Sequence, residues 1–148
     1  MFHIALYQPE IPQNTGNIVR ISVGVGAEVH LIPPLGFSLE DRYLKRAGLD
    51  YWQHAKVTVE ESLESLLERF SAERTFFFSK FATRSYWDVS YADGDLFVFG
   101  RESTGLPAEI HQHHADQLLK IPLEGPIRSH NLGNAAAIVV YEAMRQLR

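Results

Sequence analysis

Short apolar runs alternate with longer, helix-like segments along the chain, and this alternation constrains the fold more than any other feature. The run RTFFFSK contains three consecutive phenylalanines, which is typical of a strand buried on both faces. Strands that alternate with helices are typical of a mostly parallel sheet with helices on both faces. We therefore predict a single α/β domain spanning residues 1–148, with strands at residues 2–7, 27–32, 56–59, 74–80, 95–99 and 117–121.

Helix start and stop signals lie between these runs. The first helix is expected to be capped by Asn14 or Thr15 and to end at Gly24 and Gly26. The last helix is expected to be capped by Asn131, because apolar residues then recur at spacings of three and four up to the C-terminus. The other helices are predicted at residues 38–47, with Ser38 as cap, at 60–70, with its glutamates on a solvated face, and at 107–111.

Composition excludes several classes of function. The chain has 148 residues and 45% hydrophobic content, and it has no cysteine, so thiol catalysis and zinc–cysteine sites are excluded. Polar residues interrupt the N-terminal run, so no signal peptide is expected, and no stretch is long enough to span a bilayer. We expect a cytoplasmic protein with no membrane partner. The net charge of −4 argues against indiscriminate nucleic-acid binding but leaves room for a local basic surface.

Three polar, glycine-containing loops each follow a predicted buried strand, at residues 8–16, 100–107 and 125–131. In open α/β sheets, ligands bind at the carboxyl ends of the strands, so these loops are candidates for one site. The loop GRESTGLP, at residues 100–107, has neither a dinucleotide-binding nor a P-loop fingerprint. Taken alone, it could equally be a tight turn.

The histidines at 111, 113 and 114 are the metal-ligand candidates in the sequence. A metal-binding pair on a helix needs a spacing of about four residues on one face, and only Asp116 could complete the ligand set here. We therefore expect no metal site. Arg20, Arg128 and Ser129 are a more informative polar set, because an arginine binds phosphate through two nitrogens and stabilises an oxyanion. The alternative for each arginine is a solvated surface charge.

Four segments together resemble a known family, the SPOUT-class RNA methyltransferases, and within that class the tRNA (cytidine/uridine-2′-O-)-methyltransferases. They are LYQPEIPQNTGNIVR, LKRAGLDYW, FVFGRESTGLP and IPLEGPIRSHNLGNAAAIVVYEAMRQ, and the resemblance covers essentially the whole chain. It implies an α/β fold whose C-terminal part forms a trefoil knot, and a homodimer that binds S-adenosyl-L-methionine. The implied reaction is methyl transfer to the ribose 2′-hydroxyl of the wobble nucleotide, cytidine or uridine, in leucine tRNAs.

The resemblance also implies roles for individual residues. The implied catalytic residues are Arg20, Asn14, Ser129 and Asn131. The implied cofactor-binding residues are Phe78, Gly100, Glu102, Gly105, Ile121, Leu123, Ser129 and Leu132. His130 and Gly133 depart from the usual family residues at the start of the last helix. Candidate tRNA contacts are Arg42, Lys45, Arg46, Lys80 and Arg84.

Alternatives remain open within and outside this class. An enzyme of the same fold could act on another tRNA position or on ribosomal RNA. A non-catalytic RNA-binding protein could have the same fold, and the strand–helix pattern alone also fits a flavodoxin-like nucleotide-binding protein. Methyl transfer from a sulfonium needs an in-line approach and a more nucleophilic oxygen, and it needs neither a metal nor a covalent intermediate.

Overall fold

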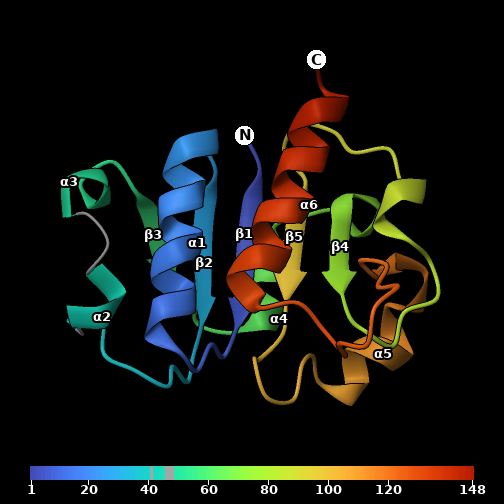
Figure 1. The fold of residues 1–148 in the computed structure, drawn as a ribbon, viewed down its shortest axis with the longest axis horizontal. Helices are drawn as coiled ribbons and strands as arrows, with labels where there is room; N and C mark the ends of the chain where they lie inside the picture. Colours follow the sequence, from blue (N-terminus) through green and yellow to red (C-terminus); the bar gives the residue numbers. More distant parts are fainter. Residues whose placement is uncertain (41, 46–48) are drawn as a thin grey trace.

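A computed structural model describes residues 1–40, 42–45 and 49–148 of the chain (Figure 1). In this part of the chain, six strands form one sheet in the order β3-β2-β1-β5-β4-β6, and every neighbouring pair is parallel. The predicted mostly parallel α/β sheet is therefore confirmed. The strands are β1 (His3–Tyr7), β2 (Glu28–Ile32), β3 (Lys56–Val59), β4 (Thr75–Phe78), β5 (Leu96–Phe99) and β6 (Leu118–Leu119).

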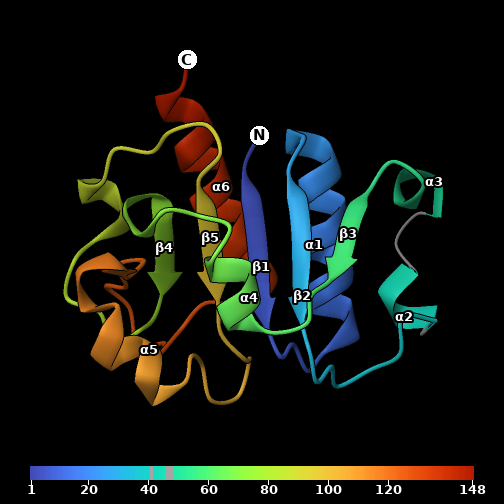
Figure 2. The same ribbon diagram turned by 180° about the vertical axis from the view of Figure 1, so that it is seen from behind.

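Helices cover both faces of the sheet. In Figure 1, α1 and α6 lie side by side over one face, and Figure 2 shows α4 and α5 on the other. The helices are α1 (Pro12–Val25), α2 (Arg42–Lys45), α3 (Leu49–Trp52), α4 (Leu63–Leu67), α5 (Ala108–His113) and α6 (Leu132–Gln146), with 3-10 turns at Ala72–Arg74, Tyr86–Asp88 and Ala115–Gln117. Within the described residues, no helix is both long and apolar enough to cross a membrane.

The central strands are buried on both faces, as the continuous apolar runs predict. On β1, Ile4 and Leu6 pack under α1 and α6, whereas Ala5 between them faces Leu63 and Leu66 of α4. All four residues of β4 and all four of β5 are buried. The sheet therefore has two apolar cores, and its central strands contribute alternate residues to each core.

The start of α1 differs from the prediction. The helix begins at Pro12, with Ile11 as its N-cap residue, so Asn14 and Thr15 lie inside its first turn and are not caps. Proline suits the first helical position because its fixed φ is already helical and its missing N–H would have no intrahelical partner there. The other end agrees with the prediction at Gly26, which ends the helix with φ +72°, a left-handed conformation that favours glycine, whereas Gly24 lies inside the helix.

The helix predicted at residues 38–47 is only partly present. Among the described residues of this segment, helix covers Arg42–Lys45, and residues 41 and 46–48, including the predicted stop at 48, lie outside the described part of the chain. Ser38 does not cap this helix. Its hydroxyl accepts a hydrogen bond from the amide of Glu40 at 3.1 Å, and such a local bond competes with helix formation.

The helix predicted at residues 60–70 is shorter than expected. Ser62 caps it in a reciprocal pair with Ser65, and the helix then covers Leu63–Leu67. Glu60 is buried, so the prediction that all the glutamates of this segment are solvated is wrong. The reason is that Arg69 pairs with the Glu60 carboxylate through contacts of 2.7 and 2.8 Å.

Strand β6 is also shorter than the predicted strand at residues 117–121. After Leu119 the chain leaves β4, and Lys120 hydrogen-bonds to the backbone of Arg84 and Tyr86 instead. This divergence directs the following segment towards the carboxyl end of the sheet, where the start of α6 lies.

Candidate active site

A cavity of about 670 Å³ opens at the carboxyl ends of the strands. It lies where the strand order reverses, because the chain runs outward from β1 to β3 on one side and places β5, β4 and β6 on the other. Such a reversal point is where parallel α/β sheets bind ligands. The predicted site residues that line the cavity are Asn14, Phe78, Gly100, Glu102, Gly105, Ile121, Leu123, Ser129, Asn131 and Leu132.

The floor of the cavity is apolar and its rim is polar. Phe78 and Phe99 stack at the floor with ring centroids 4.8 Å apart, at the ends of the neighbouring strands β4 and β5. Leu119 and Ile121 extend this apolar surface. Ser129 also lines the cavity, and it is exposed to solvent. A flat apolar floor with convergent polar groups around it is typical of a small-molecule site.

The loop after β5 is closed on itself by its own backbone. Arg101 and Gly105 exchange two backbone hydrogen bonds, of 3.1 and 2.9 Å. A Cβ at Gly100 would lie less than 3.0 Å from the backbone of Gly105 and Leu106, closer than real Cβ atoms come. Gly105 itself has φ +70°. Both glycines are therefore required by the shape of this loop, and not only by a ligand.

Glu10, Glu102 and Ser103 join the loop after β1 to the loop after β5, and we call their contacts the loop clasp. The Glu102 carboxylate accepts hydrogen bonds from the amides of Glu10 and Ile11 at 3.0 and 2.7 Å. In return, the Glu10 carboxylate accepts from the Ser103 amide at 2.9 Å and from the Ser103 hydroxyl at 2.7 Å. These bonds from Ser103 lower the pKa of Glu10 and so favour its charged carboxylate.

Asn14 connects three segments that are far apart in the sequence. Its Nδ2 donates to Glu102 at 3.3 Å, and its Oδ1 accepts from Nδ2 of Asn131 at 3.0 Å. Asn131 in turn caps α6 as predicted, because its Oδ1 accepts from the amide of Asn134 at 3.2 Å. Asn14 is buried, so its side-chain amide has to be satisfied by these protein groups.

Gly133 allows α6 to approach α1 beside this contact. A Cβ at this position would lie 3.2 Å from Oδ1 of Asn131 and 3.5 Å from Cβ of Asn17. The first distance is tighter than usual and the second is an ordinary van der Waals contact, so a Cβ here would press on the helix cap and only touch α1.

Arg20 does not line the cavity of its own chain. It is exposed on α1, and its guanidinium lies 5.8 Å from the ring centroid of Tyr51. Of the four residues with an implied catalytic role, the structure thus brings together Asn14, Ser129 and Asn131, and it leaves Arg20 apart from them.

The candidate tRNA contacts are distributed over two regions. Lys80 is exposed at the rim of the cavity, Arg84 is exposed on the same connecting segment, and Arg42 is exposed on α2. Arg46 and the side chain of Lys45 lie outside the described part of the structure.

Ser79 and His111 form a part of the cavity wall that the sequence does not predict. The Ser79 hydroxyl and Nε2 of His111 are 2.8 Å apart, and Nδ1 of His111 faces the carbonyl of Pro107 at 3.3 Å. In the sequence, His111 stands out only as a candidate metal ligand. The position that could have identified it is one helical turn after Pro107, on the helix that follows the loop after β5.

Comparison with known proteins gives consistent matches. Residues 1–141 match the SpoU rRNA Methylase family. The chain is 46% identical over 147 residues to the tRNA (cytidine(34)-2′-O)-methyltransferase of Methylovorus glucosotrophus, a match covering 99% of this chain and 96% of the relative. It is 45% identical over 148 residues to the enzyme of the same name from Escherichia coli K12, covering 99% and 94%.

Solved structures agree with these matches. One from a study of 2-OH methylation of C/U34 on tRNA superimposes with a TM-score of 0.93 at 46% identity, over 99% of this chain and 96% of that one. The SpoU methyltransferase AviRb of Streptomyces viridochromogenes, solved with AdoMet, shares the fold with a TM-score of 0.84 at 22% identity, over 98% of this chain and 57% of that one.

Proposed function

This chain belongs to the SpoU rRNA Methylase family, and from that premise we propose that it methylates the ribose 2′-hydroxyl of nucleotide 34, the wobble cytidine or uridine, in leucine tRNAs. The observation that carries the proposal is the meeting of three sequence-distant segments in one cavity, joined through Asn14. Relatives of this chain along nearly its full length carry the name of this activity.

S-adenosyl-L-methionine is the proposed cofactor, and it would supply the electrophilic methyl group. The cavity of about 670 Å³ is within the range of small-molecule sites. Its stacked floor of Phe78 and Phe99 suits an adenine ring, and the loop from Gly100 to Gly105 presents backbone groups at its edge. Ile121, Leu123, Ser129 and Leu132 complete the proposed cofactor site, with Glu102 holding its wall in place through the loop clasp.

Arg20 is the proposed catalytic residue. A ribose hydroxyl is a poor nucleophile, so a guanidinium beside it favours loss of its proton as negative charge develops on the oxygen. Arg20 can act on the oxygen directly, or it can bind the adjacent phosphate through two nitrogens. Because Arg20 lies outside the cavity of its own chain, we assign this role to the Arg20 of a second copy.

We therefore include a homodimer in the proposal. The outer surfaces of α1 and α6 lie side by side, and apolar side chains there are exposed, including Tyr141 at 51% and Leu147 at 47%. Apolar burial over a standard interface would stabilise a dimer near twice 16.8 kDa. Light scattering at micromolar concentration measures this mass, and a monomer would contradict the arrangement.

The trefoil knot is also part of the proposal. Its support is the path of the chain after β6, which returns from the edge of the sheet to the cavity beside the loop of β5 before α6 begins. Cytoplasmic location follows from the proposed substrate.

One experiment tests the function directly. The protein is incubated with labelled S-adenosyl-L-methionine and, in parallel, with total tRNA or ribosomal RNA, and any 2′-O-methyl nucleotide is mapped. We expect label at position 34 of leucine tRNAs. Label at another tRNA position or in ribosomal RNA would overturn the substrate assignment, and cofactor binding without transfer to either RNA would favour a non-catalytic RNA-binding protein.

A further inference from the structure

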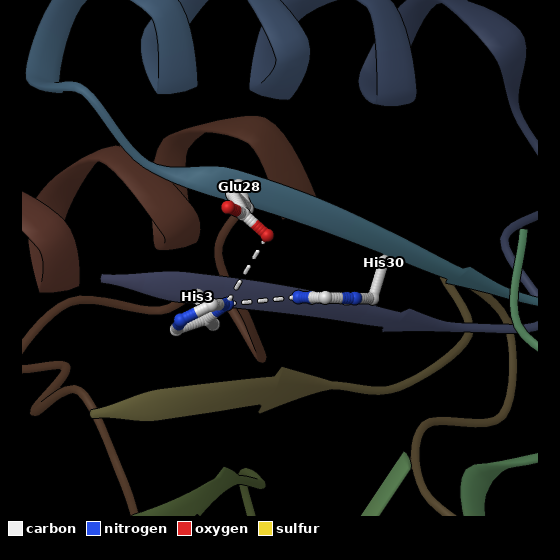
Figure 3. Close-up of side chains that lie close together, drawn as sticks. All are labelled: His3, Glu28 and His30. Carbon is white, nitrogen blue, oxygen red and sulfur yellow. Dashed lines mark hydrogen bonds and ion pairs between the residues drawn. The ribbon is translucent and has the colours of Figure 1, made fainter. Parts of the chain in front are cut away.

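Two histidines and a glutamate come together at the edge of the sheet opposite the cavity. His3 is the first residue of β1, Glu28 is the first residue of β2, and His30 lies two residues further along β2. The cavity is built at the carboxyl ends of the strands, so this cluster is a separate feature of the molecule. Figure 3 shows the three side chains pointing towards one another from the two neighbouring strands.

The parallel register of β1 and β2 places these side chains. His3 is directly opposite Glu28, and Ala5 is opposite His30, so all of these residues share one face of the sheet. Ala5 is small, which leaves room beside it for the imidazole of His30. A constellation on two paired strands is held more precisely than one on loops, because the sheet backbone determines the spacing.

The ligand atoms are within reach of one ion. Nδ1 of His3 is 3.0 Å from Nε2 of His30 and 3.7 Å from Oε2 of Glu28, and the three atoms all lie within 4.8 Å of one another. In tetrahedral zinc sites each nitrogen is about 2.0–2.1 Å from the ion, so two such nitrogens lie about 3.3 Å apart. The observed spacing of the two imidazole nitrogens therefore needs only a small adjustment.

Glu60 faces the other ring nitrogen of His30. Its Oε2 is 3.5 Å from Nδ1 of His30. This nitrogen is buried and has no closer hydrogen-bond partner among the described residues. Arg69 pairs with the same Glu60 carboxylate. A carboxylate there favours a proton on Nδ1, and this tautomer leaves a lone pair on Nε2, aimed at His3. A carboxylate behind a ligating histidine is the usual outer partner in zinc sites.

The exposure of the cluster also suits a cation. The side chains of His3 and Glu28 are 20% and 32% exposed, so an ion and a water can reach the cluster from solvent. Phe70 covers another side, with its ring centroid 4.9 Å from that of His3.

We propose that His3, Glu28 and His30 bind a divalent transition-metal cation of the zinc type. Two imidazole nitrogens and one carboxylate oxygen, with a water in the fourth position, are a known zinc ligand set. Imidazole ligands disfavour magnesium and calcium, which take oxygen ligands. The ion joins the amino ends of β1 and β2, so it stabilises the folded chain and takes no part in the chemistry of the cavity.

The rival account of the same geometry is a hydrogen bond from His3 to His30, with a proton in place of the ion. The two accounts differ in zinc uptake.

The test uses the full chain without a polyhistidine tag, treated with a chelator and dialysed, and titrated calorimetrically with Zn²⁺. We expect one Zn²⁺ per chain and a zinc-dependent rise in Tm.

The variants locate the ion. In His3→Ala and in the nearly isosteric Glu28→Gln, we expect the affinity for Zn²⁺ to fall by about tenfold or more. We also expect Zn²⁺ no longer to raise the Tm of either variant. His113→Ala is the matched control, because His113 is exposed on α5 outside the cluster, and it should bind as the wild type does. With Co²⁺ as the probe, the visible absorption of a tetrahedral ion should appear in the wild type and not in His3→Ala.

Two results would overturn the proposal. One is no uptake of Zn²⁺ by the wild-type chain at micromolar concentration, which leaves the histidine hydrogen bond alone. The other is equal affinity in the wild type and both cluster variants, which places the ion elsewhere. Chelation should leave the affinity for S-adenosyl-L-methionine unchanged, so the result does not depend on the proposed function.

Discussion

At the scale of single residues, Asn14 illustrates how a correct assignment to the site can rest on an incorrect local role. The sequence predicts it as a helix cap, and the structure places it inside the first turn of α1, with both atoms of its amide bound to distant segments. A cap can be recognised from neighbouring residues alone. A contact with Glu102 and Asn131 cannot, because it depends on how three loops meet.

Asn14→Asp tests this connecting role. The new carboxylate would replace a donor that lies 3.3 Å from the Glu102 carboxylate, and two like charges at that distance repel. We expect calorimetric affinity for S-adenosyl-L-methionine to fall by about tenfold or more, with the secondary structure retained. Gln13→Ala, an exposed neighbour on the same turn, is the control and should bind normally. Unchanged affinity in Asn14→Asp would show that the three segments hold together without this contact.

Gly100→Ala tests the loop after β5. Even one methyl group at Gly100 collides with the backbone of Gly105 and Leu106, so the loop has to move. We expect loss of cofactor binding of about tenfold or more, with an unchanged far-UV circular dichroism spectrum. Gly24→Ala meets open space in the helix α1 and should bind normally, with stability raised by about 0.5–1 kcal/mol. Normal binding by Gly100→Ala would remove this loop from the cofactor site.

At the scale of elements, the strands could be predicted and several helices could not. In a run such as FFF at residues 76–78, the side chains on both faces of the strand are apolar. The burial of the whole run therefore follows from its composition. The segment at residues 60–70 is ambiguous, because its glutamates fit an exposed helix face. Glu60 instead follows β3 directly and is buried against His30 and Arg69, partners that only the folded sheet brings near. The short β6 likewise depends on a backbone contact with residues 84–86.

The end of α6 gives an element-scale prediction about acid. Hydrogen bonds from Arg145 and Gln146 lower the pKa of Glu142 to about 2, below its usual value of 4.5. A carboxyl whose folded pKa is depressed stabilises the folded state above pH 4.5, and this contribution is lost as pH falls from about 4.5 to about 2. Because Arg145 is largely exposed, the contribution should be below about 1 kcal/mol.

Glu142→Gln removes the titrating group. The difference in the free energy of unfolding between the wild type and this variant, measured with urea, should be largest at neutral pH and should shrink towards pH 2. A difference that stays constant across that range would mean that the charge of Glu142 does not matter.

At the scale of the whole molecule, the alternation of strands and helices predicted the sheet and the end at which the cavity lies. It did not predict the cluster of His3, Glu28 and His30, because His3 and His30 are 27 residues apart and meet through the register of β1 and β2. Nor did it place Arg20, which one chain alone leaves outside the cavity.

Arg20→Ala tests whether a second copy completes the site. In single-turnover methylation at saturating tRNA, we expect a loss on the order of a hundredfold to a thousandfold, by analogy with removal of one oxyanion donor. Arg20→Lys should recover part of the rate, because lysine keeps the positive charge but lacks the planar set of N–H donors of the guanidinium. Cofactor affinity should not change in either variant.

Mixing two inactive chains separates the two possible arrangements. A mixed dimer of Arg20→Ala and Gly100→Ala chains contains one intact cavity facing one intact Arg20, if the arginine acts across the interface. Activity should then recover on mixing. No recovery, with mixed dimers present, would mean that Arg20 acts within its own chain or has no catalytic role.

The pairing of β1 with β5 also affects how the protein is made. As the chain leaves the ribosome, β1 can pair with β2, which follows soon after it, but its other edge stays open until Leu96–Phe99 has been synthesised. That edge has unpaired backbone groups, and the same strand carries the apolar residues Ile4 and Leu6, so a nascent chain exposes an apolar strand until β5 has been synthesised. The cavity needs residues up to Ala135. A ligand in it can therefore stabilise only a chain that has been synthesised as far as Ala135, so ligand binding cannot protect the open strand before β5 is made.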